Sequence, residues 1–336
     1  MSFAKPDGPV NPQSWPFIRA GAYQSYDFTW TALDHPVRHR DYAAAAIFFS
    51  ERLMAHQCFD VSIDDQIAHI RLIRPEKRNS MNAEFWSELP EIIKDIDNGA
   101  RARGIVISST GRHFSSGLDI SSIGSGEVGA GDRQAAKPDP KQRRTRGAAF
   151  YDNVRRMQST FSCLETCRIP VLAAIQGGCI GGGVDFATAC DIRYASEDAY
   201  FTVFEVNIGM TADVGTFPRL VKLIPEGIVR ELAYTGRRMS ANEAMSVGLV
   251  NRIFPDHDSL IKGVMEVAAD IAAKAPLAVY GCKQMINYAR DHSTADGLDY
   301  ISIWNASMLQ PDEMAEAITA NREHRPGDFA DLPPRR

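Results

Sequence analysis

Residues 173–185 read AAIQGGCIGGGVD, and this is the most telling stretch of the chain. An apolar strand runs into a cluster of glycines, and Asp185 follows near the start of a predicted helix. Because glycine has no side chain, a backbone N–H group can face a ligand oxygen there. The N-terminal end of the helix adds its positive dipole to that N–H. The stretch therefore predicts a site for an anionic oxygen, with an acid/base group beside it.

The composition is that of a soluble enzyme. The chain has 336 residues, of which 44% are apolar and 24% charged, and its formal net charge is −5. These values give no support for nucleic-acid or membrane binding. The six cysteines show no metal-ligand spacing, so we expect reduced thiols and no metal. No apolar run reaches the ~20 residues of a membrane span, and the N-terminus lacks the apolar core of a secretory signal, so we expect a cytoplasmic location.

The pattern along the chain divides it into three regions. Residues 1–53 carry scattered prolines and aromatics, and we expect a poorly ordered N-terminal extension. Residues 54–253 alternate strands with helices, and residues 254–336 read as helices alone, which together predict an α/β core with a helical C-terminal region. Residues 124–147 are rich in glycine, alanine and charge, which is typical of a mobile surface loop. A long helix is expected next, over residues 150–167.

Two glycine turns offer backbone donors. In residues 113–120 (HFSSGLDI), a strand end turns on Gly117, so that the N–H of Leu118 can point into a cleft. In the glycine cluster quoted above, the N–H of Gly182 can do the same at the start of a helix. Two such donors can hold an oxygen whose negative charge grows during a reaction. Either turn alone is common, so the prediction depends on the pair.

Three carboxylates are set among apolar neighbours. Asp185 lies in an apolar helix, Glu205 lies in VFEVNIG (203–209), and Asp213 lies in MTADVGT (210–216). Apolar surroundings raise the pKa of a carboxyl group, which favours proton transfer near neutral pH. Each acid also has a structural interpretation. Asp185 can be a buried partner of an arginine or a backbone amide, Glu205 a surface carboxylate, and Asp213 the N-cap of the next helix.

Together these motifs resemble the crotonase (enoyl-CoA hydratase/isomerase) superfamily. The resemblance extends from about Phe59 to the C-terminal helices. It is carried by RPEKRNSMN (74–82), FSSGLD (114–119), IQGGCIGGGVD (175–185) and the helix that ends in GLV (248–250). It implies a spiral of ββα turns closed by a helical trimerisation region. It also implies a homotrimer or hexamer that binds an acyl-CoA thioester, with no nucleic-acid or membrane partner.

The resemblance also assigns the binding residues. The N–H groups of Leu118 and Gly182 would form the oxyanion hole for the thioester carbonyl. The path of coenzyme A would be lined by Ser116, Gly117, Leu118, Asp119, Ile120 and Gly182. No cofactor is implied, because coenzyme A is part of the substrate.

The acid pattern resembles one group within the family, the Δ3,5-Δ2,4-dienoyl-CoA isomerases of fatty-acid β-oxidation. For the hydratases of the family, the resemblance implies a pair of glutamates. In this chain Asp185 and Glu205 take those two positions, and Asp213 adds a third acid. Moving a 3,5-diene to a 2,4-diene removes a proton at C2 and returns one at C6, too far apart for one short side chain. We therefore expect Asp213 as the base at C2, Glu205 as the acid toward C6, and Asp185 as an orienting group.

Two other functions stay open at this point. A 2-enoyl-CoA hydratase would use Glu205 and Asp185 to deliver water, although the shorter Asp185 side chain disfavours this interpretation. A non-catalytic scaffold that binds RNA would use Arg143, Arg144 and Arg146, against the acidic overall balance.

Overall fold

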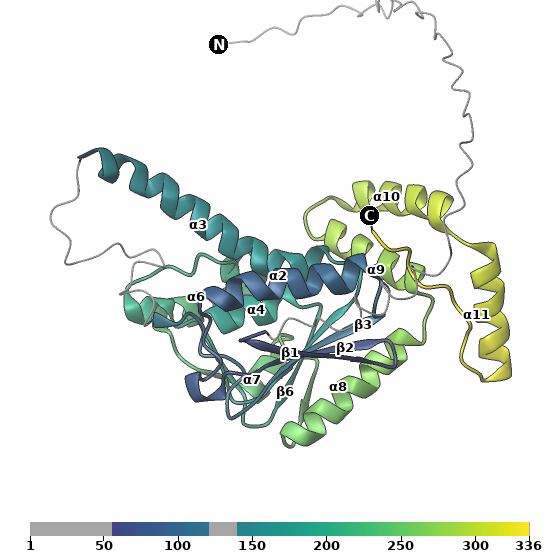
Figure 1. The fold of residues 1–336 in the computed structure, drawn as a ribbon, viewed down its shortest axis with the longest axis horizontal. Coiled ribbons are helices and arrows are strands. Elements are labelled where there is room, and N and C mark those ends of the chain that lie inside the picture. Colours follow the sequence, from purple (N-terminus) through teal and green to yellow (C-terminus); the bar gives the residue numbers. More distant parts are fainter. Residues whose placement is uncertain (1–55, 121–139, 336) are drawn as a thin grey trace, which may run out of the picture. The chain divides into compact units, whose positions relative to one another are not determined.

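The computed structural model describes residues 56–120 and 140–335, with side chains described from residue 145 onward in the second part. Figure 1 shows helices packed around a central sheet in this part of the chain. The expected N-terminal extension, residues 1–53, lies outside the described residues, as do residues 124–139 of the expected loop and the side chains of Arg143 and Arg144. The domain boundaries expected after residues 53 and 253 stay predictions.

The described strands form two sheets. The larger sheet has the strand order β1-β2-β3-β4-β6-β9, in which β1 and β2 form an antiparallel hairpin and the other neighbours pair in parallel. Its strands are β1 (Phe59–Asp64), β2 (Ile67–Leu72), β3 (Gly104–Ser109), β4 (Val171–Ile175), β6 (Ile192–Ser196) and β9 (Arg252–Phe254). The smaller sheet has the order β5-β7-β8, with β5 (Gly178–Ile180), β7 (Tyr200–Thr202) and β8 (Met239–Ser240).

Both faces of the larger sheet are buried, because its central strands send alternate side chains to two hydrophobic clusters. In β4, Val171, Ala173 and Ile175 join the main core, whereas Leu172 and Ala174 join a second cluster on the other face. Burial on both faces explains why this strand reads as an unbroken apolar run in the sequence.

The main core joins this sheet to helices α2 (Ala83–Asn98), α3 (Pro140–Thr166) and α4 (Gly182–Ala189). The rings of Phe161 in α3 and Phe186 in α4 stack with their centroids 5.3 Å apart, and Phe85 in α2 meets Phe186 edge-on at 5.7 Å. Such aromatic pairs stabilise by about 0.5–1.5 kcal/mol beyond the burial of their area. The packing fixes α4, whose first residue is Gly182.

The second cluster lies under α8 (His257–Ala272), where Leu260 and Val264 pack with Leu172. The chain then continues into α9 (Pro276–Ala289), α10 (Thr294–Met308) and α11 (Pro311–Glu323). In Figure 1, α10 and α11 lie at one end of the described fold, away from the strands. No helix among the described residues is long and apolar enough to cross a membrane.

Several elements differ from the sequence expectations. The helix expected from residue 150 begins at Pro140, so residues 140–147 are helical rather than loop. Proline is favoured in the first turn of a helix, and the following lysine, glutamine and arginines are good helix formers. The strands β5 and β9 have no clear signal in the sequence pattern. The two strands have three residues each, too few to show a period of two in the sequence.

Short elements complete the described chain. They are η1 (Pro75–Lys77), η3 (Glu205–Ile208), α5 (Thr216–Leu220), α6 (Glu226–Thr235) and α7 (Ala241–Ser246). A strand of the larger sheet is followed by one of the smaller sheet and then by a helix, as in β4-β5-α4 and β6-β7-η3. This repeat is the expected spiral of ββα turns.

Candidate functional site

The two predicted glycine turns lie against each other. Gly117 has a φ of +78°, and a Cβ added to it would lie 2.6 Å from the carbonyl oxygen of Ile180 and 2.8 Å from the nitrogen of Gly182. Any side chain at Gly117 would therefore push the two turns apart. The close approach confirms that the two loops, which are far apart in the sequence, meet in the fold.

Hydrogen bonds from both sides fix the first turn. The N–H of Met81 donates to the carbonyl of Gly117 at 2.9 Å, and the N–H of Asp119 donates to the carbonyl of Met81 at 3.0 Å. The buried hydroxyl of Ser115 accepts from the N–H of Gly117 at 3.1 Å and donates to the carbonyl of Asn79 at 2.8 Å. These bonds hold the residues on either side of Leu118.

The N–H groups of Leu118 and Gly182 lie where the two turns meet. Among the described residues, neither donates a hydrogen bond. Gly182 is the first residue of α4, so the helix itself offers its N–H no acceptor. A Cβ added to Gly182 would lie 3.5 Å from the nitrogen of Leu118, so the two amides are close neighbours. Two adjacent unpaired amides, one at a helix N-terminus, suit an oxygen that carries negative charge.

Glu205 lies beside the glycine cluster. The sheet register places it there, because β7 pairs with β5 and the N–H of Gly181 donates to the carbonyl of Thr202 at 2.9 Å. A Cβ added to Gly181 would lie 3.1 Å from Oε1 of Glu205. The other carboxyl oxygen, Oε2, is buried and has no hydrogen-bond partner among the described residues. Burial raises the pKa of Glu205, and the charge of Asp213 raises it further.

Asp213 lies in the segment between η3 and α5, which forms no helix or strand. Its carboxyl group is half-buried, and this burial raises its pKa. The charge of Asp213 raises the pKa of Glu205, so the two carboxyl groups lie within electrostatic range of each other. The structure thus brings Asp213 within electrostatic range of Glu205, and Glu205 lies next to the glycine cluster.

Asp185 lies behind these groups and is 1% exposed. Its Oδ1 accepts two hydrogen bonds from Thr216, at 2.5 Å from the backbone N–H and at 2.8 Å from the hydroxyl. Thr216 is the first residue of α5, so Asp185 satisfies an N–H that the helix leaves unpaired. Burial, followed by the charge of Glu205, raises the pKa of Asp185 to about 7. The carboxyl group thereby ties α4 to the end of the segment that carries Asp213.

The remaining predicted binding residues extend from the first turn. The N–H of Ser116 donates to the carbonyl of Arg78 at 2.9 Å. The carboxylate of Asp119 accepts from the hydroxyl of Ser80 at 3.0 Å and lies 3.5 Å from the guanidinium of Arg74. Ile120 is 66% exposed, which leaves an apolar side chain on the surface next to the turn.

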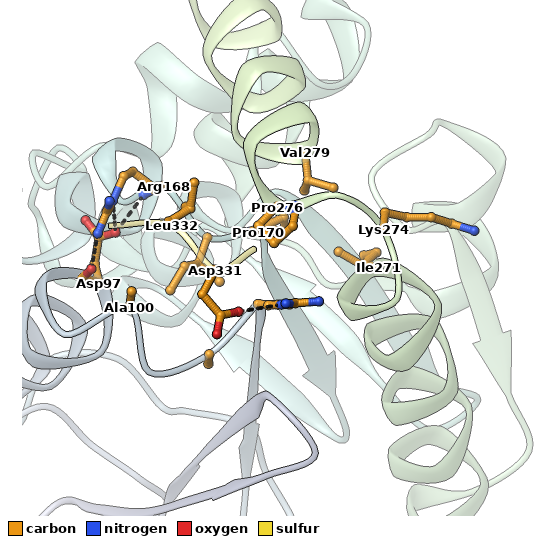
Figure 2. Close-up of a pocket in the computed structure, with 13 residues that line it drawn as sticks. Asp97, Ala100, Arg168, Pro170, Ile271, Lys274, Pro276, Val279, Asp331 and Leu332 are labelled. Atoms are coloured by element: carbon orange, nitrogen blue, oxygen red, sulfur yellow. Dashed lines mark hydrogen bonds and ion pairs between the residues drawn. The ribbon is translucent and has the colours of Figure 1, made fainter. Parts of the chain in front are cut away.

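Two other kinds of site, a metal-binding cluster and a cavity, compare poorly with these turns among the described residues. No group of three or more His, Cys, Asp or Glu side chains in the described ranges is placed to hold a metal ion. A cavity near the C-terminus, shown in Figure 2, is lined by residues that include Asp97, Arg168 and Leu332. Its volume of about 10 Å³ leaves room for roughly one water molecule. The cavity marks the seam where the C-terminal residues dock.

The model of the family described as "Enoyl-CoA hydratase/isomerase" matches residues 62–332. The chain therefore belongs to the enoyl-CoA hydratase/isomerase family, which is the crotonase superfamily that the sequence motifs resemble. The expected enzyme class and the α/β crotonase fold with C-terminal helices are confirmed.

Within the family, the chain is similar to proteins named Δ3,5-Δ2,4-dienoyl-CoA isomerase. The mitochondrial protein of Rattus norvegicus is 43% identical over 267 residues, which cover 79% of each chain. The peroxisomal protein of Arabidopsis thaliana is 38% identical over 271 residues, which cover 80% of this chain and 94% of the other. A solved structure of an enoyl-CoA hydratase from Bacillus anthracis has a TM-score of 0.70 at 28% identity, covering 82% of this chain and 100% of the other.

Proposed function

We propose that this protein converts 3,5-dienoyl-CoA to 2,4-dienoyl-CoA. The observation that carries the proposal is a second half-buried acid, Asp213, within electrostatic range of Glu205 at the paired amides of Leu118 and Gly182. The relatives named for this activity support the same conclusion. A reaction that moves a proton between two distant carbons needs two acid/base groups, and this site offers both.

The proposed chemistry consists of two proton transfers. The thioester carbonyl binds to the N–H groups of Leu118 and Gly182. One carboxylate removes a proton from C2, and the electron pair of that C–H bond moves into a dienolate whose negative charge rests on the carbonyl oxygen. A second carboxyl group then returns a proton to C6, which leaves double bonds at C2 and C4. No redox step and no cofactor enter this balance, because coenzyme A is part of the substrate.

The electrostatics support Asp213 as the base and Glu205 as the acid. Two neighbouring carboxyl groups do not ionise together, and the one that ionises second keeps its proton for use as an acid. The charge of Asp213 raises the pKa of Glu205, and an oxygen of Glu205 is buried without a partner among the described residues. The raised pKa suits Glu205 to keep a proton and return it to C6. Asp185, bonded to Thr216, orients the loop.

The test of this function is Asp213→Asn, assayed with 3,5-dienoyl-CoA. Replacing a positioned acid/base group should lower kcat by ~10²–10⁴-fold. The affinity for the acyl-CoA, measured by calorimetry with a non-reactive thioester, should stay within about threefold of wild type. Asp258→Asn, an exposed acid at the start of α8, serves as the matched control and should keep full activity. Near-full activity of Asp213→Asn would remove this residue from the mechanism.

The alternative of a 2-enoyl-CoA hydratase has less support. Asp185 would have to bind the attacking water, yet its side chain is buried and its Oδ1 already accepts two hydrogen bonds from Thr216. Crotonyl-CoA should therefore be a poor substrate, judged by a slow loss of its enoyl absorbance. A non-catalytic RNA-binding role would predict a complex with single-stranded RNA at moderate salt, and we expect none.

The proposed assembly is a homotrimer or hexamer. Helix α10 buries none of its residues, although several of its side chains are apolar, and α11 buries only Ala320. Leu298, Ile303 and Ile318 are 63%, 56% and 61% exposed in the single chain. Exposed apolar faces of this kind mark interaction surfaces. Ile303→Lys should shift the particle mass in light scattering toward the monomer, whereas Tyr234→Lys, at an exposed site on α6, should not.

A cytoplasmic location stays a prediction. The relatives from Rattus norvegicus and Arabidopsis thaliana carry the words mitochondrial and peroxisomal in their names. Imaging of the full chain in its native cell, tagged at either terminus, would decide between these compartments.

A further inference from the structure

The segment that carries Asp213 needs an external support. Residues 210–215 belong to no helix or strand, so no repeating backbone hydrogen bonds fix them. The N–H of Met210 donates to the carbonyl of Glu205 at 3.0 Å, which anchors the start of the segment. Asp185 anchors its end through Thr216. Between these points, Asp213 itself must be held by contacts from another element.

Helix α3 supplies those contacts from one face. Its residues Gln158, Ser162 and Glu165 are four and three positions apart, which places them on the same side of the helix. Gln158 donates from Nε2 to the carbonyl oxygen of Asp213 at 2.7 Å. Arg219 donates to Ser162 at 3.2 Å and to Glu165 at 2.7 Å, and also reaches the carbonyl of Val214 at 3.4 Å. The backbone of Asp213 is thus bound to α3 directly, and the backbone of Val214 is bound to it through Arg219.

The Gln158 amide is held in one orientation. Its Oε1 accepts from Nη1 of Arg155 at 2.9 Å, and its Nε2 faces the Asp213 carbonyl. A guanidinium only donates and a carbonyl only accepts, so rotating the amide by half a turn would lose both hydrogen bonds. The bond from Gln158 to Asp213 is therefore a preset contact rather than one of two equal choices.

We infer that Gln158 is a positioning residue that holds the Asp213 carboxylate in place for proton transfer. This inference rests on the proposed function. Gln158 binds the backbone of Asp213 and acts on the reaction only through the placement of that residue. Misplacing a reacting group by ~1 Å can lower the rate by ~10²-fold. Loss of the Gln158 donor should therefore lower kcat and leave substrate binding almost unchanged.

The experiment compares Gln158→Met, which keeps the side-chain length and removes the donor, in two backgrounds. In the otherwise wild-type enzyme, kcat for 3,5-dienoyl-CoA should fall by ~10- to 100-fold while KM changes by less than about threefold. In the Asp213→Asn background, Gln158→Met should cause no further loss, because its effect requires the carboxylate. Ser159→Ala, on the exposed side of the same helix, should match wild type.

Each outcome has one meaning. An equal loss in both backgrounds, or no loss of kcat in the otherwise wild-type enzyme, would overturn the inference and leave the proposed function intact. Near-full activity of Asp213→Asn alone would instead refute the proposed function. If Gln158→Met does not fold, Arg155→Met removes the group that fixes the amide and should lower kcat in the same direction by a smaller factor. An Arg155→Met enzyme with wild-type kcat would then overturn the inference.

Discussion

Replacing Asp185 by asparagine should make the protein more stable at alkaline pH. The Asp185 side chain is 1% exposed, and its burial and the neighbouring Glu205 raise its pKa to about 7. In the unfolded chain the same group has its ordinary pKa of 3.8. Above pH 7 the folded protein therefore holds a buried carboxylate that ionises more readily when unfolded. The amide introduced by Asp185→Asn would keep an oxygen that accepts from Thr216, without the charge.

The magnitude follows from the two pKa values. Each pKa unit is worth about 1.4 kcal/mol, so the step from 3.8 to about 7 corresponds to roughly 4 kcal/mol of lost stability once the group is ionised in both states. Because the pKa is higher in the folded state than in the unfolded state, the loss of stability begins above pH ~4, grows as the pH rises, and is complete above pH ~7. Rather more than half of this loss should develop between pH 5 and pH 8.5.

The assay is thermal unfolding of wild type and Asp185→Asn at pH 5 and pH 8.5, at one protein concentration. At about 2 °C per kcal/mol for a domain of this size, the Tm advantage of the variant should be about 5 °C larger at pH 8.5 than at pH 5. Glu205→Gln removes a charge that raises the pKa of Asp185, so the advantage of Asp185→Asn should be smaller in that background. An equal Tm difference at both pH values would refute the reasoning.

Two further predictions, each with a matched control, concern the oxyanion hole and the C-terminal seam. Gly182→Ala places a methyl group 3.5 Å from the nitrogen of Leu118 and should lower kcat by ~10²-fold. The control Gly227→Ala, where a Cβ meets open space, should keep wild-type kcat. Equal rates for the two variants would contradict the assignment of the oxyanion hole to Leu118 and Gly182. Asp97→Ala removes the carboxylate that pairs with the buried Arg168 and should lower the free energy of unfolding by ~3–5 kcal/mol, measured in urea. Asp95→Ala, whose partner Arg101 is exposed, should cost less than about 1 kcal/mol, and a similar cost for both would show that burial of the Asp97 pair is unimportant.

Much of the fold could be predicted from local sequence patterns. The hairpin of β1 and β2, the apolar β4 and the glycine turn before α4 each carry their own signal, because alternation, burial and backbone freedom are local properties. Ser240 followed by Glu243 three residues later is the pattern of a helix capping box, and Ser240 does cap α7, accepting from the N–H of Glu243 at 3.2 Å. The carboxylate of Glu243, however, pairs with Arg237 rather than completing the capping box. That choice depends on a neighbour outside the motif.

The candidate residues stand out in the sequence, but the contacts between them do not. Apolar flanks identify Asp185, Glu205 and Asp213 as unusual acids in the sequence. The bond from Thr216 to Asp185 joins residues 31 positions apart, and the bond from Gln158 to Asp213 joins residues 55 apart. Only packing of α3, α4 and α5 creates these contacts. A glutamine on a long polar helix gives no sequence signal that its amide binds the backbone of Asp213.

Isotope exchange at the acyl chain tests the two-acid mechanism most directly. In D₂O, the wild-type enzyme should form 2,4-dienoyl-CoA with deuterium at C6, as read by NMR. Glu205→Gln should still exchange the hydrogens at C2 while forming little 2,4-diene, and Asp213→Asn should do neither. Exchange at C2 by Asp213→Asn at the wild-type rate, above the rate without enzyme, would contradict the assignment of the base.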